Sequence, residues 1–350
     1  MNSTNHTECK LAPADVLLIV GCITIIVVGV VGNILVLIVF RSRWKRGSTT
    51  ELLICYLAVF DLLSSFFAPL IFMYWILVCW NRWDFGWFGC KLFPYIFRVF
   101  TAVSTGIILI MAIDRCQLIV FPLKGKLKRK TIHFSILVTV VVSLLWESYY
   151  ANALYIRHNR LTEVCTVVSA NTPSYAYPLI LLTILKIVIL LVVLLSSTCL
   201  VIMKIQRRNQ LVLSQNCFPK KPIKNQKTMR MIIIIAIVFI LTVAPRDILH
   251  LLFAWSWLGD KKVFQNRILI DRLNNWFRLL QVSNGIYNVF IYANLHAKFS
   301  KNLKQYLPCR FVSVAPEKRK SLALDSESTK IEVLMDKKID NEIEVLMDKR

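Results

Sequence analysis

The sequence predicts an all-α integral membrane protein: a bundle of seven transmembrane helices followed by a short helix on the membrane surface. Of the 350 residues, 56% are hydrophobic and only 18% are charged, which leaves too few polar side chains to cover a water-soluble domain. The chain also contains seven mostly apolar runs, each near the length of about 20 residues that spans a bilayer. These runs are residues 16–40, 52–80, 95–113, 132–154, 177–203, 231–257 and 276–295.

Basic residues and glycosylation sequons orient the chain in the membrane. Most of the 43 lysines and arginines follow the first, third, fifth and seventh runs, and such positive segments stay in the cytoplasm. Asn2 and Asn5 begin sequons, which are glycosylated outside the cytoplasm. We therefore predict a plasma-membrane protein with a glycosylated extracellular segment at residues 1–14 and a bundle at residues 15–295. The net charge of +23 belongs mainly to the cytoplasmic face and does not indicate nucleic-acid binding.

The segment after the bundle divides into two parts. Residues 296–309 place Phe299 and Leu303 at helical spacing with lysines on other faces, which predicts an amphipathic helix against membrane lipid. Cys309 is a candidate for palmitoylation. Residues 310–350 are predicted to be a disordered cytoplasmic tail whose serines can be phosphorylated, and arrestin is a candidate partner of that tail.

Two of the ten cysteines are candidates for a disulfide. Cys90 and Cys165 both fall on the oxidising outer side, at the start of the third helix and in the loop after the fourth. A bond between them would tie that loop over the mouth of the bundle. A second bridge between Cys9 and Cys79 remains open.

Charged side chains inside apolar runs are costly and therefore mark candidate functional positions. They are Asp61, Lys186 and the adjacent Arg246 and Asp247. A further acid and base, Asp114 and Arg115, end the third run, where they can be partly solvated near the headgroups.

Several short motifs occur together in one order along the chain. They are Gly32-Asn33, "LAVFDLL" around Asp61, "WDFGWFGCK" at residues 83–91, Asp114-Arg115-Cys116, Phe239 with Pro245, and "NVFIY" at residues 288–292. With this order and spacing, the chain resembles a rhodopsin-like (class A) G-protein-coupled receptor from about Asp15 to Cys309.

The resemblance implies a site for a heterotrimeric G protein on the inner side. In that family the acid at the position of Asp114 holds the arginine at the position of Arg115 at rest, and the arginine faces an opening cavity on activation. Asn288 and Tyr292 belong to the same coupling machinery. The alternative is an ion pair that only anchors the helix among lipid headgroups.

The resemblance also implies an allosteric sodium ion and no other cofactor. Asp61, Ser104, Asn284 and Asn288 match the family's sodium site, in which the cation offsets the carboxylate charge. A water-filled polar network around Asp61 is the alternative.

Four positions depart from the family pattern and make the activation switch atypical. Val243 and Val289 replace a tryptophan and a proline, while Leu191 and Cys199 replace a proline and a tyrosine. Without proline at residue 289, the seventh helix should kink less. Cys199 cannot supply a hydroxyl that bridges to Tyr292.

The expected stimulus is an extracellular peptide, as for a neuropeptide or peptide-hormone receptor. No lysine lies between Leu273 and Leu295, where a light sensor of this family needs one for retinal, so we expect no opsin. Phe97 stands where amine receptors have an aspartate. Pro69 and the "WDFG" loop resemble those of peptide receptors.

The predicted ligand site lies in the outer third of the bundle and is basic. Its residues are Phe97, Arg98, Lys186, Arg246, Asp247, His250 and Arg278. Because bases outnumber acids there, we predict an anionic ligand group held by Arg98 or Arg278. Alternatively, Asp247 and Glu163 neutralise some of the arginines and the ligand is neutral or basic. A small acidic or lipid ligand also remains open.

Two other functional classes receive less support. A seven-helix transporter or channel would line a path with its intramembrane charges, but the two halves of this chain show no repeat. The metal-binding, phosphate-binding and nucleophile motifs of enzymes are also absent from the sequence, so we expect no enzyme.

Overall fold

A computed structural model describes most of the membrane region. The described residues are 11–41, 47–120, 127–158, 162–168, 172–214, 224–258, 267–296 and 299–301. All of them belong to a unit formed by residues 1–306, which is separate from a second unit at residues 307–350.

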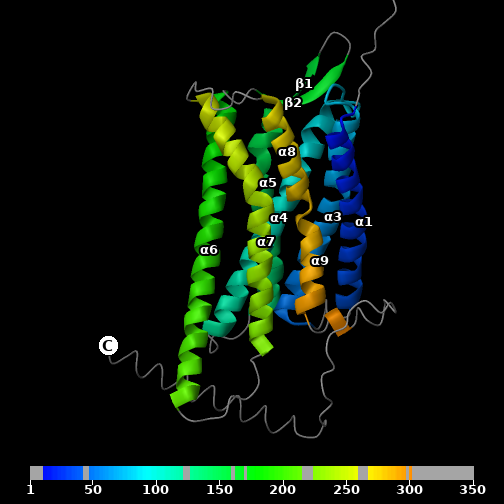
Figure 1. The fold of residues 1–350 in the computed structure, drawn as a ribbon. Coiled ribbons are helices and arrows are strands. Elements are labelled where there is room, and N and C mark those ends of the chain that lie inside the picture. The colour runs from blue at the N-terminus through cyan, green and yellow to red at the C-terminus, as the bar shows by residue number, and fades with distance from the viewer. Residues whose placement is uncertain are drawn as a thin grey trace, which may run out of the picture. The chain divides into compact units, whose positions relative to one another are not determined.

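Helices make up nearly all of the described unit, and they run alongside one another (Figure 1). In chain order they are α1 (Pro13–Phe40), α3 (Thr49–Leu77), α4 (Gly86–Val120), α5 (Arg129–Ala153), α6 (Pro173–Ser214), α7 (Lys224–Leu258), α8 (Arg267–Val282) and α9 (Asn284–Leu295). Within the described residues, six helices are long and apolar enough to cross a membrane. Together α8 and α9 form the seventh pass, so the predicted helical membrane bundle is confirmed.

The start of α3 is set by capping side chains, which lie outside the apolar run. At the start of α3, the Ser48 hydroxyl accepts from the Glu51 N–H at 3.3 Å, and the Glu51 carboxylate accepts from the Ser48 N–H at 3.0 Å. This reciprocal pair satisfies two backbone donors that the first turn leaves free. As a result α3 begins at Thr49, three residues before the predicted apolar run.

The core lies where α3, α4, α7 and α9 pack together. Its fully buried side chains include Leu57, Ile107, Met111, Phe239 and Tyr292. Large apolar side chains also cover the outer surfaces of α1, α5 and α6. A helix that is apolar on every face suits lipid better than water, which agrees with the predicted setting.

A single hairpin lies at the end of the described bundle where α5 ends and α6 begins (Figure 1). Strand β1 (Leu154–His158) pairs antiparallel with β2 (Glu163–Val167), and Ile156 faces Cys165 in the register. Because β1 follows α5 directly, the hairpin is anchored to the end of that helix.

The seventh pass is interrupted at Ser283, which the sequence analysis did not anticipate. α9 runs unbroken through Val289, as expected at a position without proline. The interruption occurs six residues earlier, where Asn33 donates to the Gly285 carbonyl at 3.4 Å. A side chain at residue 285 would place its Cβ 2.9 Å from the Ser65 hydroxyl, so only glycine allows this approach of α9 to α3.

Candidate functional site

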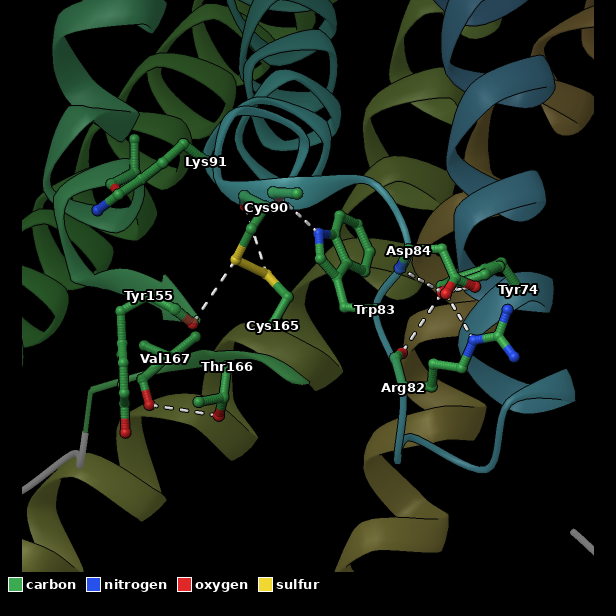
Figure 2. The surroundings of a disulfide bond; sticks show 12 residues. Tyr74, Arg82, Trp83, Asp84, Cys90, Lys91, Tyr155, Cys165, Thr166 and Val167 are labelled. Atoms are coloured by element: carbon green, nitrogen blue, oxygen red, sulfur yellow. Dashed lines mark hydrogen bonds and ion pairs between the residues drawn. A yellow bond between two sulfur atoms is a disulfide. The ribbon is translucent and has the colours of Figure 1, made fainter. Parts of the chain in front are cut away.

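The outer mouth of the bundle is closed on one side by the predicted disulfide. Cys90 in α4 and Cys165 in β2 are bonded, with a Cα–Cα distance of 5.5 Å, as Figure 2 shows. Lys91 adds hydrogen bonds of 3.0 and 3.1 Å to the carbonyls of Ala151 and Asn152. The disulfide therefore fixes the hairpin to α4, and Lys91 joins α4 to the end of α5.

The "WDFG" loop packs directly beside this disulfide. The Trp83 indole is buried against Cys90 and donates to the Gly86 carbonyl at 2.9 Å (Figure 2). Asp84 accepts from Arg82 at 2.5 Å and from the Tyr74 hydroxyl at 3.0 Å. The hydrogen bond from Arg82 lowers the pKa of Asp84 below its ordinary value. Cys79 is also disulfide-bonded, and its candidate partner Cys9 lies outside the described residues.

Four of the predicted ligand residues line one cavity in the outer part of the bundle. Phe97 and Arg98 reach it from α4, Arg246 from α7 and Arg278 from α8. The lining also includes residues that the prediction missed, among them Phe72, Trp75, Tyr150 and Gln281. Lys186, Asp247 and His250 are not among the lining residues.

Arg98 is neutralised by a carboxylate from the neighbouring helix. Its Nε donates to Glu147 at 2.5 Å and its Nη2 to the Tyr149 hydroxyl at 2.9 Å. The guanidinium carbon also lies 4.5 Å from the centre of the Tyr150 ring. Arg98 is thus held from three sides by α5.

Arg246 and Arg278 have no carboxylate partner among the described residues. Arg246 donates to the Gln281 side chain at 2.5 Å, and its Nε is buried without an acceptor. The Arg278 Nε and Nη1 are also buried without an acceptor. Its guanidinium lies 5.0–5.2 Å from the ring centres of Phe72, Trp75 and Trp80.

The acids expected to neutralise these arginines are bonded elsewhere. Asp247 forms an ion pair with Lys186, which joins α7 to α6. Glu163 lies 3.3 Å from His158 in the exposed hairpin. The alternative in which Asp247 and Glu163 pair with the arginines is therefore wrong.

Three of the four predicted sodium ligands, Asp61, Ser104 and Asn288, are joined by hydrogen bonds in the middle of the bundle. Ser104 donates to Asp61 Oδ1 at 3.1 Å, and Asn288 donates to Asp61 Oδ2 at 2.7 Å. Asn284 instead accepts from Thr242 in α7 at 3.2 Å. Carboxylate, hydroxyl and amide oxygens are suitable donors for a hard cation. The arrangement fits both a sodium site and a polar network.

At the inner end of α4 the predicted acid and base are paired and buried. Arg115 donates to Asp114 Oδ2 from Nη2 at 2.6 Å and from Nε at 3.1 Å. Thr49, which the sequence analysis missed, donates to the same oxygen at 3.2 Å from α3. Burial of both side chains does not fit a pair exposed among lipid headgroups.

Tyr292 is buried, and its hydroxyl has no hydrogen-bond partner among the described residues. Cys199 is exposed on α6 and offers it none, in agreement with the predicted loss of that bridge. Phe299 packs on Phe40 with ring centres 6.0 Å apart. The other modification sites, Asn2, Asn5 and Cys309, lie outside the described residues.

Comparison with known proteins identifies the family. The family described as "7 transmembrane receptor (rhodopsin family)" matches residues 32–292. The chain belongs to this family. The family consists of receptors and not enzymes, which confirms both the predicted membership and the predicted absence of catalysis.

Several relatives that match most of the chain carry opsin names. Melanopsin-A of Danio rerio is 27% identical over 85% of this chain and 50% of its own length. The "Rhodopsin, GQ-coupled" of Mizuhopecten yessoensis is 25% identical over 85% of this chain and 60% of its own length. The chain therefore spans about half to three-fifths of these relatives. The finer prediction, that it is most similar to peptide receptors, is not supported by them.

Two further matches bear on fold and on part of the chain. Squid rhodopsin has a TM-score of 0.68 with 17% identity, covering 87% of this chain and 91% of its own, and this likeness shows the fold. C-C chemokine receptor type 3 of Cavia porcellus is 32% identical over 121 residues, which are 35% of this chain and 33% of the relative.

The residues of this chain do not fit covalently bound retinal. A retinal Schiff base requires a lysine amine, and α8 and α9 contain no lysine. Lys186 in α6 is held in its ion pair with Asp247, and Lys91 donates to backbone carbonyls of α5. The cavity instead presents arginines, which cannot form such a bond at neutral pH.

Proposed function

We propose that the protein is a plasma-membrane receptor with an extracellular N-terminus, which binds a peptide carrying an acidic group and activates a heterotrimeric G protein. The observation that carries this proposal is the cavity with Arg246 and Arg278, which lack a carboxylate partner among the described residues. Guanidinium groups bind carboxylates through two parallel hydrogen bonds, so the cavity favours an anionic ligand group.

The opsin names of the relatives make light the competing stimulus. Two observations oppose it: the absence of lysine from α8 and α9, and the charged cavity. The partial similarity to a chemokine receptor is compatible with a peptide. A small acid or a lipid with an acidic headgroup would use the same arginines. Membership in a receptor family sets aside the transporter or channel.

The inner side of the bundle supports coupling to a G protein. Asp114 and Arg115 form a buried pair that can be exchanged for other partners, as a two-state switch requires. The name of the relative from Mizuhopecten yessoensis includes "GQ-coupled", which makes intracellular calcium the first signal to measure. We include arrestin as a partner of the phosphorylated tail, and sodium at Asp61 as a negative modulator of agonist binding.

A ligand screen in cells tests the proposed function. Cells expressing the receptor are exposed to acidic, amidated and hydrophobic peptides, to small dicarboxylic acids, and to light after loading with retinal. Calcium and cyclic AMP are read in parallel. We expect a response to acidic peptides that falls at least tenfold in potency when the acid is converted to its amide, equivalent to about 1.4 kcal/mol.

Matched variants separate the arginine site from general damage. Arg278→Gln should remove the preference for the acidic form, while Arg82→Gln, in an exposed loop pair, should leave it unchanged. A response to light in retinal-loaded cells, with none to any peptide or acid, would show that the proposal is wrong. An equal response to acid and amide would keep a receptor but reject the anionic ligand.

A further inference from the structure

The charges around the outer cavity are distributed unevenly among its arginines. Glu147 neutralises Arg98, and Asp247 neutralises Lys186. The remaining outer carboxylates of the described chain are bonded elsewhere or exposed: Asp15 caps α1, Asp84 binds Arg82, Glu163 binds His158, and Asp271 faces outward. Arg246 and Arg278 therefore contribute two positive charges without a matching carboxylate among the described residues.

The surroundings of Arg246 and Arg278 replace only part of the interactions that water would make with their guanidinium groups. Three aromatic rings surround the Arg278 guanidinium at 5.0–5.2 Å, and such rings stabilise a cation without accepting its in-plane hydrogen bonds. Three guanidinium nitrogens, one on Arg246 and two on Arg278, are buried and find no acceptor among the described residues. Both arginines line the same cavity, and their like charges repel each other. A bound anion would supply the missing hydrogen-bond acceptors and would also offset the repulsion between the two positive charges.

We propose that Arg246 and Arg278 form a site for a doubly charged anionic group, such as a dicarboxylate, a phosphate or a sulfate. A single carboxylate would neutralise one guanidinium and leave the second charge buried, which is unfavourable. A ligand group with two negative charges matches the two positive charges of the site. The aromatic side chains of Phe72 and Trp75 in the same lining supply an apolar wall for the part of the ligand next to that group.

This inference rests on the proposed function only in placing the ligand in the outer cavity, and it assigns the roles of the arginines differently from the sequence prediction. Arg98 was a candidate anchor, but its Nε and Nη2 are already engaged by Glu147 and Tyr149. It becomes a positioning residue that holds α4 to α5. The ligand charge is carried by Arg246 and Arg278, from α7 and α8.

Thermal unfolding of the purified, ligand-free receptor tests the charge assignment without a known ligand. Arg278→Met removes the charge and keeps a flexible side chain among the aromatic rings. It should raise the midpoint by about 2–4 °C, while Arg278→Lys, which retains the charge, should not. Arg246→Met should raise the midpoint similarly. Arg98→Met should lower it, because Glu147 is then left buried without its partner.

The second arm of the experiment uses succinate and acetate as probes, at equal ionic strength and neutral pH. Succinate should stabilise the wild type more than acetate does, and each of Arg246→Met and Arg278→Met should abolish the difference. Inorganic phosphate and an alkyl phosphate, tested in the same way, distinguish a small acid from a lipid headgroup.

The proposal is overturned if Arg246→Met and Arg278→Met both lower the midpoint as Arg98→Met does, because their role is then structural. It is also overturned if succinate and acetate stabilise the wild type equally. Either result leaves the proposed function intact when acidic peptides still trigger calcium release. Failure of the peptide screen alone, with the stability pattern present, would reject the peptide and retain the site.

Discussion

The buried pair at the inner end of α4 allows a quantitative prediction of basal activity. Asp114→Asn retains an oxygen that can accept from Arg115 and Thr49 but removes the negative charge. Asp114 Oδ2 accepts three hydrogen bonds at 2.6, 3.1 and 3.2 Å, two of them from the guanidinium. A hydrogen bond to a charged group contributes about 1.5–3 kcal/mol, so the resting state should lose at least about 1.5 kcal/mol.

That loss shifts the receptor toward its active state if Arg115 leaves Asp114 on activation. A difference of about 1.4 kcal/mol changes an equilibrium tenfold, so the active fraction should rise about tenfold in Asp114→Asn. The assay is ligand-free calcium and cyclic AMP in cells with matched surface expression. Thr49→Val, which removes one neutral donor, should give a smaller rise. If Asp114→Asn shows the same basal signalling as the wild type, the hypothesis that Asp114 holds Arg115 in the resting state is wrong.

Three further predictions concern the outer mouth and the middle of the bundle. Cys90→Ser should destabilise the receptor by about 4 kcal/mol, because the bond closes a loop with a sequence separation of 75 residues, and a reducing agent should shift thermal unfolding of the wild type more than that of the variant, which keeps the disulfide of Cys79. Gly285→Ala should cost about 1–3 kcal/mol, since its Cβ would lie 2.9 Å from the Ser65 hydroxyl, as unfolding midpoints would show. Sodium should lower agonist affinity relative to an organic cation at equal ionic strength, and Asp61→Asn should abolish this difference in radioligand binding.

The helices could be predicted from the sequence because a segment that spans lipid must be a long apolar run, and such runs are visible in the sequence. The seven predicted runs each correspond to a helix or, in the last pass, to α8 and α9 together. The boundaries shifted outward where side chains cap the first turn, as Ser48 and Glu51 do. The interruption at Ser283 was not predicted, and the close approach of Gly285 to α1 and α3 beside it involves residues far away in sequence.

The candidate site was predicted in part. The partners of its arginines were not predicted, because they come from helices far away in the sequence. The family resemblance placed Arg98 and Arg278 in the outer third and Arg246 at a comparable depth, and all three line one cavity. Their partners depend on the rotation of neighbouring helices, which periodicity does not give. Glu147, 49 positions from Arg98, became its partner. The aromatic residues around Arg278 carried one available signal, since Trp75 and Trp80 both stand at the outer end of the second run.

The interruption at Ser283 connects the two polar centres of the bundle through α7. On the outer side of the break, Arg246 of α7 holds Gln281 of α8 at 2.5 Å. On the inner side, Thr242 of α7 holds Asn284 of α9 at 3.2 Å, one turn before the Asn288 that binds Asp61. We therefore predict that an anion bound to Arg246 would act on a helix that contacts both segments, and that the interruption of the helix between α8 and α9 would let the two segments move separately. In a receptor that lacks the family's helix-seven proline, we expect this interruption to act as a hinge between the predicted ligand cavity and the Asp61 network.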